Sequence, residues 1–267
     1  MANTSWEATL IARDPYRPYF SDYATGVFTD FIELNGDRRF SNDKAISGGF
    51  ARLDGKPVML IGHNKGGVDV HLKAEHRFGL PVPDGYRKAL RLMRLAEKFN
   101  TPVITLIDTS GAYPGIEGEE RGQAEAIAGN LVEMAQLQVS IVCIVVGEGG
   151  SGGALGIGVG DCVMMLENAV YSVISPEGCA GILWRDGTKA ELAANALKIT
   201  ANDLLNFGII DKIIKEPVGY AQKNHQKTFE NVKTALLEEL DALQKLTPQK
   251  RIHKRIEKFS KMGVYNG

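Results

Sequence analysis

The sequence predicts an α/β fold with a mainly parallel sheet built from repeated ββα units. Two apolar runs flank Asp54-Gly55, a dipeptide typical of a two-residue hairpin turn. A segment with helical periodicity covers Asp84–Phe99, and a short apolar run follows it. The same order of helix and apolar run repeats further along the chain, which is typical of a parallel sheet.

The first unit starts after an irregular segment. Residues 1–45 are aromatic-rich, and we expect them to form an arm that packs on the body. The hairpin strands cover Gly48–Leu53 and Pro57–Gly62. In the helix over Asp84–Phe99, Asp84 is available as the cap.

The later elements repeat this order. They are a strand at Val103–Ile107, a helix at about Glu119–Gln136, a strand at Val139–Val146, a glycine loop, a short helix within Ala154–Gly160, strands around Cys162–Leu166 and Ala169–Ile174, helices over Gly187–Lys198 and Ala201–Phe207, a strand at Ile209–Ile214 and a final helix at about Asn224–Met262. We expect a single domain over residues 1–267, with a core at 46–215 and a helical segment at 216–267.

Composition excludes several classes of protein. The chain has 267 residues, 44% of them hydrophobic, and can bury a substantial core. A net charge of −1 argues against a general nucleic-acid-binding role. No signal peptide and no apolar run of membrane-spanning length is evident, so we expect a cytoplasmic protein without a membrane partner.

Three isolated cysteines, Cys143, Cys162 and Cys179, lack the C-x-x-C spacing of a metal site. Neither a zinc site nor a disulfide framework is indicated. We interpret each as a small buried hydrophobic residue, with Cys179 the nearest to a possible site.

The segment Gly147-Glu-Gly-Gly-Ser-Gly-Gly-Ala154 follows a buried strand and precedes a helix. A phosphate-binding P-loop would need a Gly-Lys-Ser/Thr ending, and no lysine lies between Gly147 and Gly160. A serine nucleophile at Ser151 satisfies G-x-S-x-G but needs a histidine partner, and only His225 and His253 lie downstream. A purely structural turn and a backbone oxyanion hole are the other interpretations.

Several motifs together resemble those of a known family. They are Arg17-Pro-Tyr19, Asp43-Lys-Ala-Ile46, Ala51-Arg-Leu-Asp-Gly55, Asp84-Gly-Tyr-Arg-Lys-Ala-Leu-Arg-Leu-Met93, Gly111-Ala-Tyr-Pro-Gly115, Glu119-Glu-Arg-Gly122, Gly147 to Ala154 and Tyr171-Ser-Val-Ile-Ser-Pro-Glu-Gly-Cys179. On these segments the chain resembles alpha subunits of bacterial acetyl-coenzyme A carboxylase carboxyltransferases nearly from end to end. The resemblance implies the crotonase-like (ClpP/crotonase) fold, a spiral of ββα units.

The resemblance also implies a reaction and its site. A carboxyl group moves from carboxybiotin on a carrier protein to acetyl-CoA and gives malonyl-CoA, the committed entry to fatty acid synthesis. Backbone N–H groups of Gly152 and Gly153, with the Gly111-Ala112 loop facing them, are then the expected catalytic donors for the ureido oxygen. Four residues are expected to shape the cofactor pocket: Gly149, Gly150, Tyr113 and Glu177. Capping or packing roles remain open for Tyr113 and Glu177.

The expected partners also follow from the resemblance. They are a zinc-containing beta subunit in an α2β2 assembly, a biotin carboxyl carrier protein and biotin carboxylase, with no metal in this chain. ATP and nucleotide binding are further expectations for a carboxylase component. Another biotin-dependent acyl-CoA carboxylase, malonate decarboxylase and a non-catalytic paralogue remain as alternatives.

Three departures from the family pattern bear on these expectations. Ser110 stands where the family usually has proline, and this change frees one N–H group. The stretch Gly66-Gly-Val-Asp69 replaces a Gly-Arg-Glu-Thr pattern. A helical N-terminal extension of roughly fifty residues, seen in longer members, does not precede Arg17-Pro-Tyr19, and we expect this to affect assembly more than chemistry.

Overall fold

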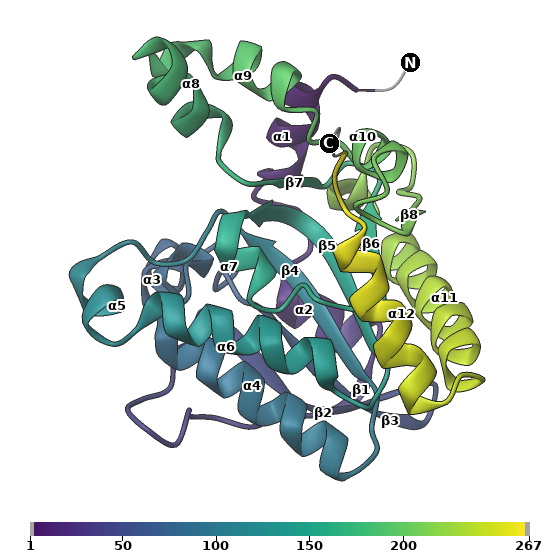
Figure 1. The fold of residues 1–267 in the computed structure, drawn as a ribbon. Coiled ribbons are helices and arrows are strands. Elements are labelled where there is room, and N and C mark those ends of the chain that lie inside the picture. The colour runs from purple at the N-terminus through teal and green to yellow at the C-terminus, as the bar shows by residue number, and fades with distance from the viewer. Residues whose placement is uncertain (1–2, 265–267) are drawn as a thin grey trace.

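The computed structural model describes residues 3–264, which are organised around one eight-stranded sheet (Figure 1). The strands are β1 (Thr29–Glu33), β2 (Ile46–Leu53), β3 (Lys56–His63), β4 (Val103–Thr109), β5 (Ile141–Gly150), β6 (Cys162–Leu166), β7 (Val170–Ser172) and β8 (Lys212–Ile214). Their order is β1-β2-β3-β4-β5-β6-β8, with β7 paired to β5.

Strand directions confirm the expectation of a mainly parallel sheet. The β1–β2 and β2–β3 pairs are antiparallel, whereas β3, β4, β5, β6 and β8 run parallel. Asp54 and Gly55 form the turn between β2 and β3, and both have positive φ angles, of 51° and 76°. The predicted two-residue hairpin is therefore confirmed.

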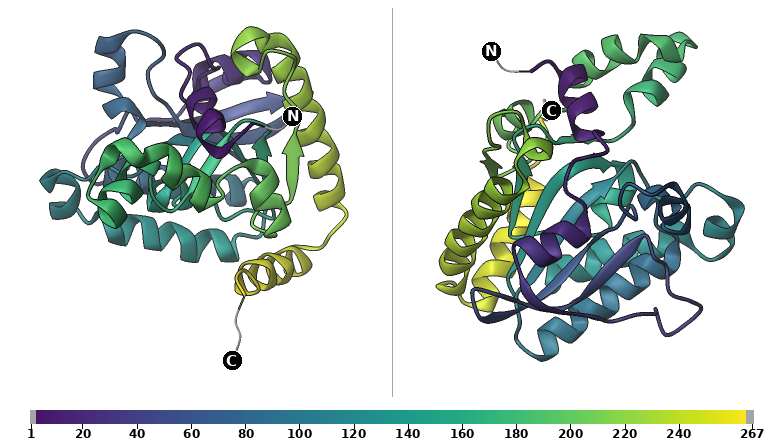
Figure 2. Two further views of the ribbon diagram at one scale, coloured as in Figure 1. Left: turned by 90° about the horizontal axis from the view of Figure 1, so that it is seen from above. Right: turned by 180° about the vertical axis from the view of Figure 1, so that it is seen from behind.

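Helices cover both faces of the sheet. They are α1 (Ser5–Ala12), α2 (Phe20–Gly26), α3 (Val70–Glu75), α4 (Pro83–Lys98), α5 (Ile116–Glu120), α6 (Gln123–Gln136), α7 (Ser151–Leu155), α8 (Pro176–Trp184), α9 (Ala190–Leu197), α10 (Ala201–Asn206), α11 (His225–Gln244) and α12 (Pro248–Ser260). Helices α4 and α6 lie side by side over one face, while α2 and α11 lie on the other (Figure 2). The main hydrophobic core lies between these layers and includes the central strands.

Some expected elements have different boundaries in the structure. The helix expected at Glu119–Gln136 is interrupted, because Gly122 adopts a left-handed conformation with φ of 81° and separates α5 from α6. The predicted cap Asp84 is wrong: Pro83 occupies the first helical position and Val82 is the N-cap. Asp84 is instead buried inside the first turn.

The expected final helix over Asn224–Met262 is two helices. Pro248 begins α12 after the cap Thr247, so α11 ends at Gln244 and the chain turns. Helix α12 is anchored by Arg255, which is 1% exposed and binds Asp161 together with the carbonyls of Met134, Leu137 and Val139. A C-terminal residue thus provides donors for carbonyls at and beyond the end of α6.

The first 45 residues contain more regular structure than expected. Helix α1 begins with a capping box between Thr4 and Glu7, and β1 joins the edge of the sheet. Arg17 is 4% exposed, binds the Glu216 carboxylate and donates from Nε to the Val146 carbonyl at 2.8 Å. This segment is therefore tied to β5.

Helices α8 and α9 project away from the sheet as a pair (Figure 1). Helix α8 is not among the elements expected from the sequence. This projecting pair has only small hydrophobic clusters, one of which contains Cys179, Ala180 and Ala193. Its connection to the body passes through α1 and β7.

Candidate functional site

The candidate site lies where β4 and β5 end at the same edge of the parallel sheet. Strand β5 extends through Gly147, Gly149 and Gly150, and α7 begins directly after it at Ser151. The glycine loop expected between strand and helix is therefore wrong, because these glycines belong to the strand. Here Gly149–Gly153 is called the glycine turn, and Ser110–Gly115, which follows β4, is called the facing loop. Thr109 and Gly149 are paired in the sheet, so the two segments lie side by side.

The backbones of the two segments approach too closely for side chains at two positions. A β-carbon at Gly150 would collide with the Ser110 carbonyl, and one at Gly153 would collide with the Gly111 carbonyl carbon and the Ala112 nitrogen. Glycine is therefore required at both positions by close backbone approach. Gly152 differs, since a β-carbon there would meet only the Ile127 side chain at 3.8 Å.

The geometry brings four predicted residues together. Gly152, Gly153, Gly111 and Ala112 form one patch of backbone, and the first N–H groups of α7 have no partner within the helix. Such donors can stabilise an oxygen that gains negative charge. Because α7 has five residues, individual N–H groups and not a long helix dipole provide this capacity.

Ser151 is strained, with φ of 51° at the strand-to-helix turn. The same geometry is typical of a serine nucleophile on a sharp turn. A histidine base is nevertheless missing from its hydrogen-bond partners within residues 3–264: His225 Nε2 contacts the Tyr16 carbonyl, and His253 faces Glu257 on α12. The described part of the chain therefore offers no Ser–His pair at this turn.

Three buried side chains hold carbonyl groups within and just after α7. The Tyr86 hydroxyl donates to the Gly153 carbonyl at 3.1 Å, and Asn130 Nδ2 donates to the Gly156 carbonyl at 2.8 Å. Thr105 Oγ1 donates to the Ile157 carbonyl at 2.8 Å. These contacts come from α4, α6 and β4, so three elements of the core fix the short helix.

Polar side chains gather where three adjacent strands end. Lys65 Nζ lies 2.5 Å from Asp108 Oδ1, and the same oxygen accepts the Glu148 N–H at 3.0 Å. His63 Nδ1 accepts the Asp108 N–H at 3.4 Å. Burial lowers the pKa of His63 to about 4, although the Asp108 carboxylate opposes this shift. His63 is therefore neutral near pH 7.

Arg13 links the site to the projecting pair. Its Nε donates to Glu148 at 2.7 Å and its Nη1 donates to Glu177 at 2.6 Å. Burial opposes the charge on Arg13, but the two carboxylates outweigh it and raise its pKa. The hydrogen bond from Arg13 lowers the pKa of Glu177. The predicted pocket residue Glu177 is thus held in an ion pair.

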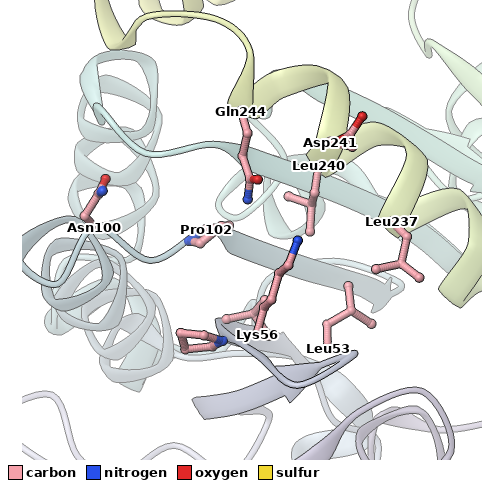
Figure 3. A pocket seen from close by; sticks show the side chains of 10 residues that line it. Leu53, Lys56, Asn100, Pro102, Leu237, Leu240, Asp241 and Gln244 are labelled. Carbon is pink, nitrogen blue, oxygen red and sulfur yellow. The ribbon is translucent and has the colours of Figure 1, made fainter.

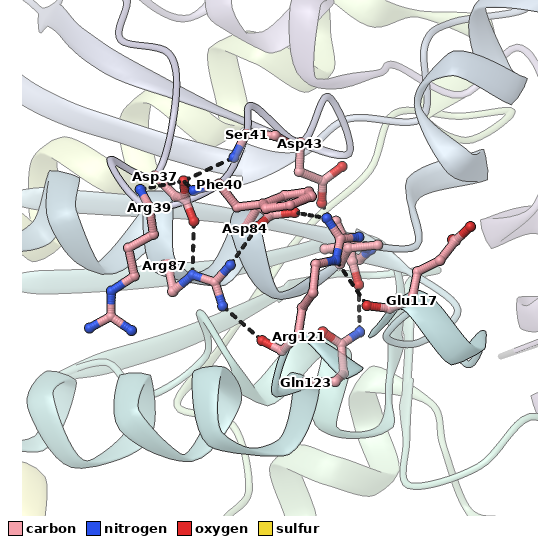
Figure 4. A network of polar contacts seen from close by, with 12 residues as sticks. Asp37, Arg39, Phe40, Ser41, Asp43, Asp84, Arg87, Glu117, Arg121 and Gln123 are labelled. Carbon is pink, nitrogen blue, oxygen red and sulfur yellow. Dashed lines mark hydrogen bonds and ion pairs between the residues drawn. The ribbon is translucent and has the colours of Figure 1, made fainter. Parts of the chain in front are cut away.

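A second polar network lies around the start of α4 (Figure 4). Asp84 pairs with Arg87 at 2.5 Å and with Arg121 at 2.7 Å, and Arg87 also binds Asp37. Gln123, the first residue of α6, donates from Nε2 to the Tyr113 carbonyl at 3.1 Å. Gln123 therefore holds the backbone of the facing loop, while the Asp84 ion pairs hold the first turn of α4.

Tyr113 and Gly149, both predicted to shape the cofactor pocket, each pack against a neighbouring residue. The Tyr113 ring covers Gly115, and the Arg77 guanidinium lies 5.8 Å from the ring centre. Gly149 is buried against the Tyr171 ring. A cofactor role for either residue stays a prediction.

A largely apolar cavity of about 390 Å³ opens beside the glycine turn. Gly152 and Leu155 line one side, and Val173, Leu204 and Phe207 are among the residues on the others. Another cavity, of about 250 Å³, lies under α11 beside the hairpin turn, with Lys56 and Gln244 in its wall (Figure 3). The hairpin turn precedes β3, whereas the glycine turn is at the carboxyl end of β5, so the two lie at opposite ends of the parallel strands. The cavity of about 390 Å³ is therefore the one that adjoins the candidate site.

Sequence analysis missed Tyr86, Asp108 and Arg13 as contributors to this site. Asp108 could have been found, because a polar residue at the end of a buried parallel strand lies at the functional edge. Arg13 and Tyr86 reach the site from distant segments, and no local pattern identifies them. Ser110, the departure from the family pattern, is exposed and contacts Gly150 through its carbonyl.

Other expectations concern metals, membranes and nucleotides. Within residues 3–264 no group of three or more His, Cys, Asp or Glu side chains could hold a metal ion. None of the helices described is long and apolar enough to cross a membrane. ATP binding is not supported, since the relatives reported below are named only for carboxyl transfer and the glycine turn lacks a P-loop lysine.

Comparison with known proteins gives a family match over residues 2–263, to a family described as acetyl co-enzyme A carboxylase carboxyltransferase-like. The chain is 54% identical over 262 residues to an acetyl-coenzyme A carboxylase carboxyl transferase subunit alpha of Stenotrophomonas maltophilia, covering 98% of this chain and 82% of the relative. It is 57% identical over 269 residues to the protein of the same name from Pelodictyon phaeoclathratiforme, covering 98% and 80%.

Two solved structures with a similar fold are distant in sequence. A transcarboxylase 12S structure has a TM-score of 0.65 at 16% identity and covers 94% of this chain and 43% of that one. The beta subunit of Pseudomonas aeruginosa geranyl-CoA carboxylase has a TM-score of 0.65 at 18% identity, covering 99% and 47%. At these identities the likeness concerns the fold alone, which is the crotonase-like fold expected from the sequence.

Proposed function

Because the chain belongs to the acetyl co-enzyme A carboxylase carboxyltransferase-like family, we propose that it is the alpha subunit of an acetyl-CoA carboxyltransferase. It would transfer a carboxyl group from carboxybiotin to acetyl-CoA and form malonyl-CoA. One observation carries this proposal: identity of 54% to a relative named as that subunit, across 98% of the chain. The geometry of the glycine turn supports it.

The backbone of the glycine turn suits the charge that develops in this reaction. Carboxybiotin supplies the carboxyl group, and negative charge moves onto its ureido oxygen as the N–C bond breaks. The N–H groups of Gly152 and Gly153 would donate to that oxygen, with Gly111 and Ala112 alongside. Losing one such donor typically costs about 3 kcal/mol of transition-state stabilisation.

The adjoining cavity fits the shape of the group that must enter. The biotin ring system has an apolar body and one polar edge. The cavity of about 390 Å³ has apolar walls, including Leu155, Val173 and Phe207, and opens at Gly152. This arrangement would place the polar edge of the ring at the backbone donors and its apolar body against the side chains.

We propose that this chain forms half of an active site. The enolate of acetyl-CoA needs a second oxyanion hole, and the family assigns that site to a zinc-containing beta subunit. An α2β2 assembly, a biotin carboxyl carrier protein and biotin carboxylase would complete the enzyme. The exposed apolar residues Ile182 and Leu183 are available to another chain, being 73% and 63% exposed.

The reverse reaction tests the function directly. The chain is mixed with its cognate beta subunit, malonyl-CoA and a biotin derivative, and release of acetyl-CoA is followed. We expect turnover in the mixture and almost none with either subunit alone. A stable complex without turnover would indicate a non-catalytic paralogue, and the absence of any complex would reject the assignment.

Two variants separate the backbone mechanism from a serine nucleophile. Gly152→Pro removes one N–H donor and should reduce turnover about 100-fold or more. Ser151→Ala keeps all backbone donors and should retain most of the turnover. Loss of activity in Ser151→Ala, together with labelling by a fluorophosphonate, would support a serine hydrolase instead.

A further inference from the structure

The conformation of the glycine turn is not fixed by its own residues. Four of the five residues at 149–153 are glycine, which has the widest range of φ and ψ angles. The direction of an N–H group depends on those angles. Contacts from outside the turn must therefore set the directions of the Gly152 and Gly153 N–H groups.

The Gly153 carbonyl is the point where such a contact is made. Tyr86, on α4, is 0% exposed and its hydroxyl donates to this carbonyl at 3.1 Å. The Tyr86 ring also packs against Gly156, where a β-carbon would collide with it. Because the Tyr86 carbonyl accepts the Asn130 side-chain amide at 3.0 Å, the tyrosine is held at both its backbone and its hydroxyl.

Besides Tyr86, His63 is another neutral side chain close to the glycine turn. A ring nitrogen that accepts a hydrogen bond carries no proton, so Nδ1 accepts from Asp108 and the proton is on Nε2. This Nε2 is buried and has no hydrogen-bond partner among the described residues. The Gly153 backbone is close enough to influence the pKa of His63.

We propose that Tyr86 is a positioning residue for carboxyl transfer. Its hydroxyl holds the Gly153 carbonyl, in the peptide that directly follows the one carrying the Gly153 N–H, and it thereby fixes the start of α7 and the adjoining N–H donors of the glycine turn. The inference is based on the proposed function of that turn. Tyr86 does not touch the reacting atoms, since its hydroxyl lies on the carbonyl side of Gly153. Its removal should therefore lower kcat while leaving the binding of both substrates intact.

The variant Tyr86→Phe removes only the hydroxyl and keeps the ring against Gly156. Tyr23→Phe is the matched control, because Tyr23 is also 0% exposed and its hydroxyl has no hydrogen-bond partner in the described part of the chain. Tyr23 packs against Phe229 at 5.3 Å between ring centres, on the α2 and α11 side of the sheet. Both variants are assayed in the reverse reaction as complexes with the beta subunit.

We expect Tyr86→Phe to lower kcat by about tenfold or more, since small misplacements of catalytic groups have effects of this size or larger. The KM values for malonyl-CoA and the biotin derivative should stay within about twofold, and Tyr23→Phe should keep kcat within about twofold. Equal kcat in Tyr86→Phe and the wild type would overturn the inference. Equal losses in both variants would also overturn it, because they would indicate a general effect of core hydroxyls.

Hydrogen exchange of the isolated chain gives a test that does not depend on activity. In Tyr86→Phe the amides of Gly156, Ile157 and Gly158, which close α7, should exchange faster, while Tyr23→Phe should leave them unchanged. Unchanged exchange in Tyr86→Phe would reject the positioning role even if the wild type had no turnover. Faster exchange in an inactive wild-type background would reject the proposed function alone.

Discussion

The glycine turn and the projecting pair α8–α9 are supported in opposite ways. The turn sits on the main core, where Tyr86, Asn130 and Thr105 are all buried and each holds a carbonyl in or just after α7. The projecting pair has small clusters of its own, and Ile182 and Leu183 on α8 are largely exposed. The proposed backbone donors are thus surrounded by packed side chains, whereas α8 keeps an apolar surface uncovered.

Arg13 is the structural link between these two regions. Its guanidinium group contacts Glu148 on β5 and Glu177 on α8. Two segments that are neighbours in the sequence can therefore be held in place by different parts of the molecule. Residues 151–155 and 176–184 are close in sequence. The first segment is held by distant core residues, whereas the second packs on α9 and the turn at Gly187–Lys189 and reaches the N-terminal segment through Arg13.

The largest loss of turnover should come from filling a close backbone contact of the glycine turn. Gly153→Ala places a β-carbon against Gly111 and Ala112, so the turn must move, and we expect turnover to fall by about 1000-fold. Gly129→Ala on α6 is the control, because the β-carbon that alanine adds there would meet no other group within 4 Å. That control should keep full activity; normal turnover in Gly153→Ala would show that the turn is not the site.

Acid should destabilise the core beneath the turn through His63. Because burial lowers the pKa of His63 to about 4, the unfolded chain binds a proton at higher pH than the folded chain. Stability is therefore full above pH ~6.5 and falls by up to about 3 kcal/mol as pH drops toward 4. Denaturant unfolding across this range should show a weaker pH dependence in His63→Gln.

The control for this acid effect is His253→Gln, whose side chain is 82% exposed and which should keep the wild-type pH dependence. An identical pH dependence in the wild type and His63→Gln would assign the acid sensitivity to other groups. In that case the carboxylates at the carboxyl ends of β4 and β5 would be the next to replace.

Breaking the Arg13 link between the two regions should lower the free energy of unfolding by a moderate amount. Arg13→Ala leaves Glu148 and Glu177 without their partner, and we expect unfolding stability to fall by about 1 to 2 kcal/mol, since both ion pairs are partly exposed. Hydrogen exchange should increase in α8 more than in α6. Lys245→Ala, which breaks an exposed pair with Asp241, should change neither quantity.

The smallest effect should come from the exposed face of α8. Ile182→Ser should change the stability of the isolated chain by less than about 0.5 kcal/mol, because the side chain is 73% exposed. Ile144→Val in β5, which is 0% exposed, should cost about 1 kcal/mol although it removes only one methylene. Equal effects in denaturant unfolding would remove the distinction between the two regions.

Much of the sheet could be predicted because its patterns are local. The hairpin at Asp54-Gly55, the helix near Asp84 and the short apolar strands were all identified from periodicity and turn residues. The spacing of Thr4 and Glu7 is that of a capping box, so the start of α1 is also encoded locally. Pro83 indicated the true start of α4, and Pro248 the true start of α12.

The remaining differences have long-range causes. Strand β5 continues through its glycines because Gly149 pairs with both Thr109 and Tyr171, and this pairing outweighs the low strand propensity of glycine. The close approach of the glycine turn and the Gly111-Ala112 loop could be predicted, and the role of the turn in holding an oxyanion stays a prediction. The side chains that hold the turn could not be predicted. Tyr86 lies 67 residues from Gly153, and no local pattern encodes their contact.

Arg255 has a consequence for the order in which the chain can be completed. The carbonyls of Met134, Leu137 and Val139 receive donors from a residue synthesised more than one hundred positions later. Domains begin to fold during synthesis, starting from the N-terminal side. A nascent chain can therefore assemble its central strands early, yet these buried carbonyls stay without their native donor until translation has passed codon 255.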